Sequence, residues 1–145
     1  MKHSAYAIMG VTGKVGGAVA RTLLSARQPV RALVRDTVKG EAWKQRGCEV
    51  AFAEIGDAVS LTNAFEGVAG VFILPPAVFD PSPDFSEARV TAGALRSALE
   101  AARPPRVVYL STIGAQADEL NLLSQHTIIE QALGDLLMPV TFLCP

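Results

Sequence analysis

The chain has 145 residues, of which 50% are hydrophobic and 19% are charged, and its formal net charge is −1. This length and this apolar content suit one domain with a sizeable core, and they exclude an intrinsically disordered chain. Prolines interrupt the longest apolar stretch before it reaches the ~18 residues of a membrane span, and a pI near 6.1 argues against direct nucleic-acid binding.

Apolar runs of strand length alternate along the chain with segments of helical length. In the first half, we predict strand 5–9, helix 14–25, strand 30–34, helix 37–46, strand 49–53 and a helix that Asp57 or Ser60 caps and that ends near 65. In the second half, we predict strand 70–74, a loop with four prolines at 75–83, helix 85–102, strand 107–111, a helix that ends near 133 and strand 140–143. Six strands joined by helices predict an α/β fold with a parallel sheet between two helix layers.

A glycine-rich loop lies between the first predicted strand and the first predicted helix, and it reads GVTGKVGG over residues 10–17. Glycine permits a tight turn and lets the backbone approach a pyrophosphate, while the helix N-terminus supplies free N–H groups. This context predicts a dinucleotide site, and the alternative is a turn that needs its glycines for packing alone. The predicted cofactor contacts in this loop are Gly10, Thr12, Gly13, Lys14, Val15 and Gly16.

Basic residues follow the second predicted strand, at the place where nucleotide-binding folds of this kind contact the ribose. An acidic residue there binds the 2′-hydroxyl of NAD, whereas an arginine accommodates the 2′-phosphate of NADP. Arg35 stands at this place and Lys39 follows it, so the sequence favours NADP, with NAD as the alternative. The competing interpretation gives the ribose to Asp36 and leaves Arg35 in solvent. The first 50 residues carry nine Lys and Arg against three Asp and Glu, a balance that attracts anions.

Cysteine and aromatic side chains are predicted to have structural roles. Cys48 and Cys144 are too few for a disulfide framework or a metal cluster, and they indicate a reducing compartment. The apolar stretch near the N-terminus is too short for a secretion signal. We therefore expect a cytoplasmic protein without a metal site. Trp43 is expected to pack on an apolar helix face, and Tyr109 is expected to lie in the core or behind the site.

With these motifs on hand, the sequence resembles the NmrA-like members of the atypical (extended) short-chain dehydrogenase/reductase superfamily. The resemblance rests on the glycine loop and on the segments VRALVRD at 30–36, GVFILPP at 70–76, RVVYLSTIGA at 106–115 and PVTFL at 139–143. It implies a Rossmann-type sheet with strand order 3-2-1-4-5-6 and NADP bound over the C-terminal ends of the strands. It also places Glu54 and Ile55 near the adenine, and Leu74 and Pro75 along the ribose and nicotinamide.

The resemblance also carries an expectation about domains. Members of this family usually continue into a smaller substrate-binding region after the last strand of the sheet. We therefore expect residues 1–145 to form one NAD(P)-binding Rossmann domain in which the C-terminal substrate-binding region is missing.

The resemblance points to candidate catalytic residues as well. The wider superfamily uses Ser, Tyr and Lys, with the Tyr and the Lys four residues apart. Ser111 matches the serine, but Leu122 stands at the tyrosine position and His126 at the lysine position. Because Glu130 follows His126 by one helical turn, it can orient and charge the imidazole as a proton donor. The alternative is an exposed helix pair without a catalytic role.

A site without a strong acid suits acceptors that take hydride at an electrophilic centre while solvent supplies the proton. The sequence therefore favours an NAD(P)H-dependent oxidoreductase that reduces a quinone-like small molecule. The resemblance also permits a non-catalytic NADP-binding sensor, whose cofactor occupancy alters its docking to a regulatory protein. A homodimer is compatible with either function.

Overall fold

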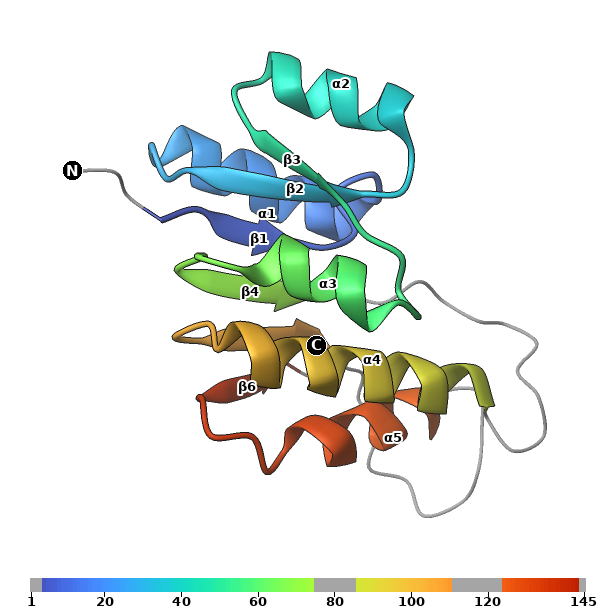
Figure 1. Ribbon diagram of the computed structural model, residues 1–145. Helices are drawn as coiled ribbons and strands as arrows, with labels where there is room; N and C mark the ends of the chain where they lie inside the picture. Colours follow the sequence, from blue (N-terminus) through green and yellow to red (C-terminus); the bar gives the residue numbers. More distant parts are fainter. Residues whose placement is uncertain (1–3, 75–85, 111–123, 144–145) are drawn as a thin grey trace.

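The computed structural model describes residues 4–74, 86–110 and 124–143, apart from the side chains of residues 124–127. Six parallel strands form one sheet in the order β3-β2-β1-β4-β5-β6, which confirms the predicted Rossmann-type topology (Figure 1). The strands are β1 (Tyr6–Ile8), β2 (Val30–Val34), β3 (Glu49–Phe52), β4 (Gly70–Ile73), β5 (Val107–Leu110) and β6 (Val140–Leu143). The helices are α1 (Lys14–Ser25), α2 (Thr37–Gln45), α3 (Ala58–Phe65), α4 (Ser86–Ala102) and α5 (Ser124–Leu133).

Most predicted boundaries lie within one residue of the observed ones. Strand β1 is shorter than the predicted 5–9 because Gly10, at φ +76°, turns the chain directly after Met9. Of the two residues proposed to cap α3, Asp57 is the N-cap, and its carboxylate accepts a hydrogen bond from the amide of Val59. Each helix within the described ranges is too short or too polar to cross a lipid bilayer.

A hydrophobic core on each side of the sheet holds the helices in place. Helices α3, α4 and α5 pack on one face, in front of the sheet in Figure 1, and α1 lies behind it. Tyr109 is fully buried in the first core, where its ring meets that of Phe142 edge-on at 6.0 Å between centroids. Trp43 is buried in the second core, between α2 and the sheet, and the Arg46 guanidinium lies 5.0 Å from its ring centroid. The structural roles predicted for Trp43 and Tyr109 are confirmed.

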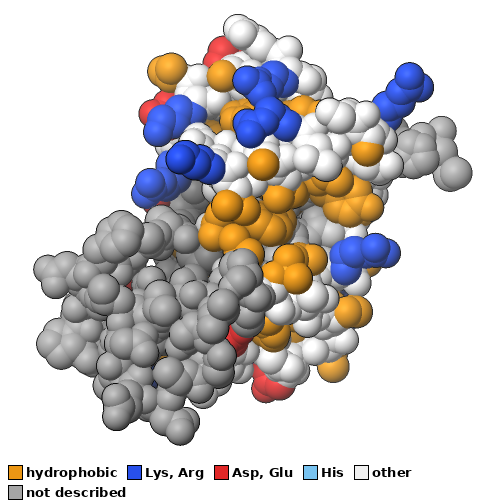
Figure 2. All heavy atoms as spheres, turned by 180° about the vertical axis from the view of Figure 1, so that it is seen from behind, with side chains coloured by type: hydrophobic (Ala, Val, Ile, Leu, Met, Phe, Trp, Pro, Cys, Tyr) orange, Lys and Arg blue, Asp and Glu red, His pale blue; other side chains and the backbone are white. Residues whose placement is uncertain are grey.

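The face that carries α1 and α2 is covered unevenly. Both helices pack against the half of the sheet formed by β1, β2 and β3. On the other half, Phe72 of β4 is buried, Val108 of β5 is half-buried and Leu143 of β6 is 46% exposed. Figure 2 views the molecule from this side and shows apolar side chains gathered in the middle of the face. The sheet therefore offers apolar surface beside α1, whereas parallel strands are commonly covered on both sides.

Candidate functional site

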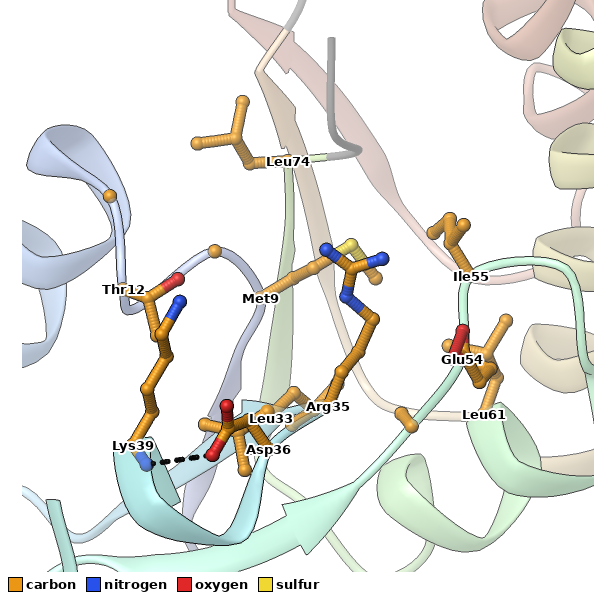
Figure 3. Close-up of a pocket in the computed structure, with 14 residues that line it drawn as sticks. Met9, Thr12, Leu33, Arg35, Asp36, Lys39, Glu54, Ile55, Leu61 and Leu74 are labelled. Atoms are coloured by element: carbon orange, nitrogen blue, oxygen red, sulfur yellow. Dashed lines mark hydrogen bonds between the residues drawn. The ribbon is translucent and has the colours of Figure 1, made fainter. Parts of the chain in front are cut away.

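A cavity of about 640 Å³ opens at the carboxyl ends of β1, β2, β3 and β4 (Figure 3). The strand order reverses between β1 and β4, and the crevice at such a reversal is the usual ligand-binding place of an open parallel sheet. The predicted cofactor residues that line the cavity are Gly10, Thr12, Gly13, Arg35, Lys39, Glu54, Ile55 and Leu74. The fold thus brings together loops that are far apart in the sequence.

The turn after β1 depends on glycine for two different reasons. Gly10 has φ +76°, a left-handed conformation that favours glycine. A Cβ at Gly16 would lie 2.2 Å from the carbonyl oxygen of Gly10, so α1 can approach the sheet only without a side chain there. The amide of Gly13 donates to the same carbonyl at 3.0 Å and closes the turn. The glycine spacing therefore builds a narrow cradle in front of α1.

Helix α1 begins directly behind this turn, and no side chain caps its N-terminus. Gly13 is the N-cap residue, with an extended backbone and no side-chain cap bond. The amides of residues 14–16 therefore lack the carbonyl partner that later helical residues have. Together with the positive end of the helix dipole, they can bind an anion such as a pyrophosphate.

Three of the predicted contact residues lie in the first turn of α1, beside the cavity. Lys14 and Val15 lie along an outer groove of α1, together with Val19 and Leu23. Gly16 is buried behind the turn. None of these three lines the cavity itself.

Two cations stand on the β2 side of the cavity. Arg35 follows β2 and Lys39 lies in the first turn of α2, and both side chains are exposed. In Figure 3, Lys39 extends toward Thr12 and Arg35 toward Met9. Within the described part of the chain, neither cation forms an ion pair. Their charges are therefore available to an anionic ligand in the cavity.

The carboxylate between these two cations has a structural partner. Oδ1 of Asp36 accepts hydrogen bonds from the amide of Val38 at 2.7 Å and from the amide of Lys39 at 3.3 Å, and so it caps α2. Asp36 lines the cavity beside Arg35, but its Oδ1 is engaged in this cap, whereas Arg35 forms no ion pair among the described residues. This geometry favours Arg35 over Asp36 as the group that faces the ligand.

The opposite wall of the cavity comes from the loop after β3 and from α3. Ile55 and Leu61 give this wall an apolar surface, and Glu54 adds an exposed carboxylate. Figure 3 shows Glu54, Ile55 and Leu61 across the cavity from Lys39. An apolar wall with few polar groups suits a flat heterocycle.

Three of the predicted site residues fall wholly or partly outside the described residues. Pro75 and Ser111 lie outside them, as does the side chain of His126. His126 belongs to α5, where Glu130 is half-buried. The roles given to Pro75, Ser111 and His126 stay predictions.

Met9, Leu33 and Leu61 line the cavity although the sequence did not point to them. All three are also buried members of the core on the α3 side of the sheet. In the sequence they are indistinguishable from other core residues, because one apolar side chain can face both the core and the cavity. Only the position of Met9, directly before Gly10, is a signal that could have identified it.

The sequence model of the NmrA-like family matches residues 2–144 of the chain. The chain is 34% identical over 111 residues to the NAD(P)H azoreductase of Xenophilus azovorans, covering 77% of this chain and 36% of that protein. It is 29% identical over 134 residues to quinone oxidoreductase 2 of Escherichia coli, covering 89% and 44%. The crystal structure of Citrobacter sp. triphenylmethane reductase complexed with NADP(H) is similar with a TM-score of 0.80 at 26% identity, covering 97% of this chain and 48% of that one. The chain spans less than half the length of each of these proteins.

Proposed function

Since the chain belongs to the NmrA-like family, we propose that it forms the NADP-binding domain of an NAD(P)H-dependent oxidoreductase. The observation that carries this proposal is the cavity at the end of β1. The N-terminus of α1, which no side chain caps, lies on one side of it, and Arg35 and Lys39 lie on the other. Neither cation forms an ion pair with another described residue. A Cβ at Gly16 would meet the backbone of Gly10 and Met9, so glycine there lets the start of α1 pack close behind the turn.

The cavity and the N-terminus of α1 beside it offer a partner for each part of NADP. The amides of residues 14–16 would hold the diphosphate, and Arg35 with Lys39 would hold the 2′-phosphate. The wall that contains Glu54 and Ile55 would hold the adenine. NADP is favoured over NAD because Arg35 and Lys39 line the cavity without an ion pair among the described residues, whereas Oδ1 of Asp36 is engaged in the α2 cap.

The nicotinamide end is assigned from fewer contacts. Leu74 lines the cavity on the β4 side, and we propose that it lies beside the ribose and nicotinamide together with Pro75. When bound, the reduced coenzyme supplies a hydride. Ser111 is proposed to hydrogen-bond the acceptor or the nicotinamide amide, and His126 is the candidate proton donor.

The proposed acceptor is a quinone-like or dye-like small molecule. Similar proteins are named an azoreductase, a quinone oxidoreductase and a triphenylmethane reductase. Leu122 stands at the position where the superfamily places its tyrosine acid, and this fits an acceptor that needs no strong acid. The buried, free thiol of Cys48 fits the reducing cytoplasm in which we propose that the protein works.

A second function is compatible with Leu122, because leucine cannot donate a proton at the position of the superfamily's tyrosine. This function is a non-catalytic sensor whose NADP occupancy controls its docking to a regulatory protein or to a second copy. The reductase is preferred because the similar proteins named above are reductases. A sensor requires an affinity for its partner that differs between the free and the NADP-bound states.

The test of the reductase is optical. NADPH oxidation is followed with a panel of quinones, azo dyes and triphenylmethane dyes, using both this chain and the longest natural polypeptide that contains it. We expect at least one acceptor to be reduced, and we expect Arg35→Ala to slow turnover with NADPH more than turnover with NADH. NADPH binding without reduction of any acceptor would contradict the reductase and favour the sensor.

A further inference from the structure

We infer that Ser60 is a positioning residue for the adenine end of the cavity, an inference that rests on the proposed NADP site. Ser60 does not line the cavity, and it lies half-buried in the first turn of α3. Its hydroxyl nevertheless ties the cavity wall to the helix. Its Oγ accepts a hydrogen bond from the amide of Glu54 at 3.0 Å and donates one to the carbonyl of Asp57 at 3.2 Å.

The N-terminus of α3 is capped by Asp57, so the hydroxyl of Ser60 can bind the loop before the helix. The carboxylate of Asp57 caps the helix by accepting from the amide of Val59 at 3.1 Å. In a capping box, the residue at the position of Ser60 reaches back to the amide of the N-cap residue. Here the Asp57 amide already donates to the Glu54 carbonyl at 3.0 Å. Ser60 therefore reaches three residues further, to the amide of Glu54.

The remaining contacts hold the loop on either side of Glu54 and Ile55, the two residues that form the cavity wall. Before them, the amide of Ala53 donates to the carbonyl of Val34 at 3.1 Å and extends the pairing between β2 and β3. After them, Gly56 lies against Val90 of α4, since a Cβ there would be 3.3 Å from Val90 Cγ1. The main chain of Glu54 is thus held at its carbonyl by the Asp57 amide and at its amide by Ser60, and the bond to Ser60 is the one made by a side chain.

Loss of the hydroxyl leaves the Glu54 amide without its partner and releases the wall. The effect is confined to the adenosine end, because the diphosphate site is built by the turn after β1 and by α1. One neutral hydrogen bond is worth a net factor of about three to ten in an equilibrium. We therefore expect Ser60→Ala to weaken binding of an adenosine phosphate by about that factor and to leave pyrophosphate binding unchanged.

Thr62 supplies a matched control on the same helix. Its Oγ1 donates to the carbonyl of Ala58 at 2.7 Å, so Thr62→Ala also removes a hydroxyl–carbonyl bond of α3 but no tie to the loop. Ser60→Thr keeps a hydroxyl at the inferred position and tests for rescue. Each variant and the unchanged chain are titrated with 2′,5′-ADP and with inorganic pyrophosphate, and amide hydrogen exchange is measured at Glu54.

The inference predicts a higher Kd for 2′,5′-ADP and faster exchange of the Glu54 amide in Ser60→Ala alone. Thr62→Ala and Ser60→Thr should stay within about twofold of the unchanged chain, a difference too small to count as a lost hydrogen bond. Equal Kd values in Ser60→Ala and Thr62→Ala would overturn the inference and leave the proposed function standing. Failure of the unchanged chain to bind either probe would instead refute the proposed function, and the inference with it.

Discussion

Two adjacent side chains at the end of β2 divide the work of the chain between folding and recognition. Asp36 caps α2, because its Oδ1 accepts a hydrogen bond from the amide of Val38 in the first turn of that helix. Arg35 points into the cavity, where its planar guanidinium can grip a phosphate with two hydrogen bonds. The sequence already favoured Arg35 over Asp36 at the ribose, and the cap made by Asp36 Oδ1 supports this preference.

Arg35→Ala tests this division. Because a hydrogen bond to a charged group contributes about 1.5–3 kcal/mol, we expect the Kd for NADPH to rise by a factor of about 10 to 100. NADH has no 2′-phosphate, so its Kd should change little. Isothermal titration calorimetry measures both, with Arg21→Ala as the control, since Arg21 is an exposed arginine on α1 outside the cavity. An unchanged ratio of the two Kd values would remove the phosphate role of Arg35.

The unit formed by β1, its turn and α1 shows how local sequence becomes a binding geometry. Gly16 and Gly17 are buried against the turn, whereas Gly13 stands exposed at the start of the helix. A Cβ at Gly13 would lie 3.5 Å from the Gly10 carbonyl oxygen, an ordinary contact. The glycines of this one motif therefore differ, since Gly16 serves the close packing and Gly13 leaves the anion site open.

Substitution by alanine separates these roles. Gly16→Ala places a Cβ 2.2 Å from backbone oxygen, which no side-chain rotation relieves, so the free energy of unfolding should fall by about 2 kcal/mol or more. Gly13→Ala should cost only about 0.5 kcal/mol, because its φ of −97° suits alanine. Urea unfolding of both variants measures the difference, and equal stabilities would show that the packing role of Gly16 is wrong.

The strands and helices were predictable because apolar runs and turn residues repeat along this chain at regular distances. Gly10 and Arg35 of the cavity were predictable because their residue types carry chemistry, whereas Ile55 and Leu74 were predicted only through the family resemblance. Met9 and Leu61 were not predicted to line the cavity, because an apolar residue of the core and one of a cavity wall look alike in a sequence. The roles of Asp36 and Ser60 depend on which nearby amide each side chain reaches, and several amides are within reach of an Asp or a Ser in a loop.

Across the molecule, the sheet joins a cavity at one edge to a core in which Tyr109 is fully enclosed. Burial raises the pKa of Tyr109 above its ordinary value, and the nearby charge of Glu130 raises this pKa further. The folded protein therefore holds the phenolic proton more tightly than the unfolded chain does. Stability from this group is complete below the unfolded pKa of about 10 and is lost as the pH rises above it.

Tyr109→Phe should flatten this alkaline loss. Between pH ~9 and pH ~11, Tm of the unchanged chain should fall more steeply than Tm of Tyr109→Phe. Unfolding exposes the phenol of Tyr109, which then ionises and stabilises the unfolded chain, whereas the phenylalanine of the variant has no proton to lose. Tyr6→Phe removes the other tyrosine, keeps Tyr109 and should retain the steeper fall. Thermal unfolding followed by circular dichroism gives the slopes, and identical slopes in all three proteins would contradict the linkage.

The most direct measurement follows the backbone amides of the turn and of α1 by NMR as NADPH is added. If a diphosphate binds at the uncapped helix N-terminus, the amide signals of residues 13–16 should shift in a saturable way, together with those of residues 35–39 beside the 2′-phosphate. Amides at the far end of the sheet, such as those of Arg103 and Arg106, should not move. A folded chain whose amides at 13–16 stay unchanged at saturating NADPH would contradict the proposed cofactor site.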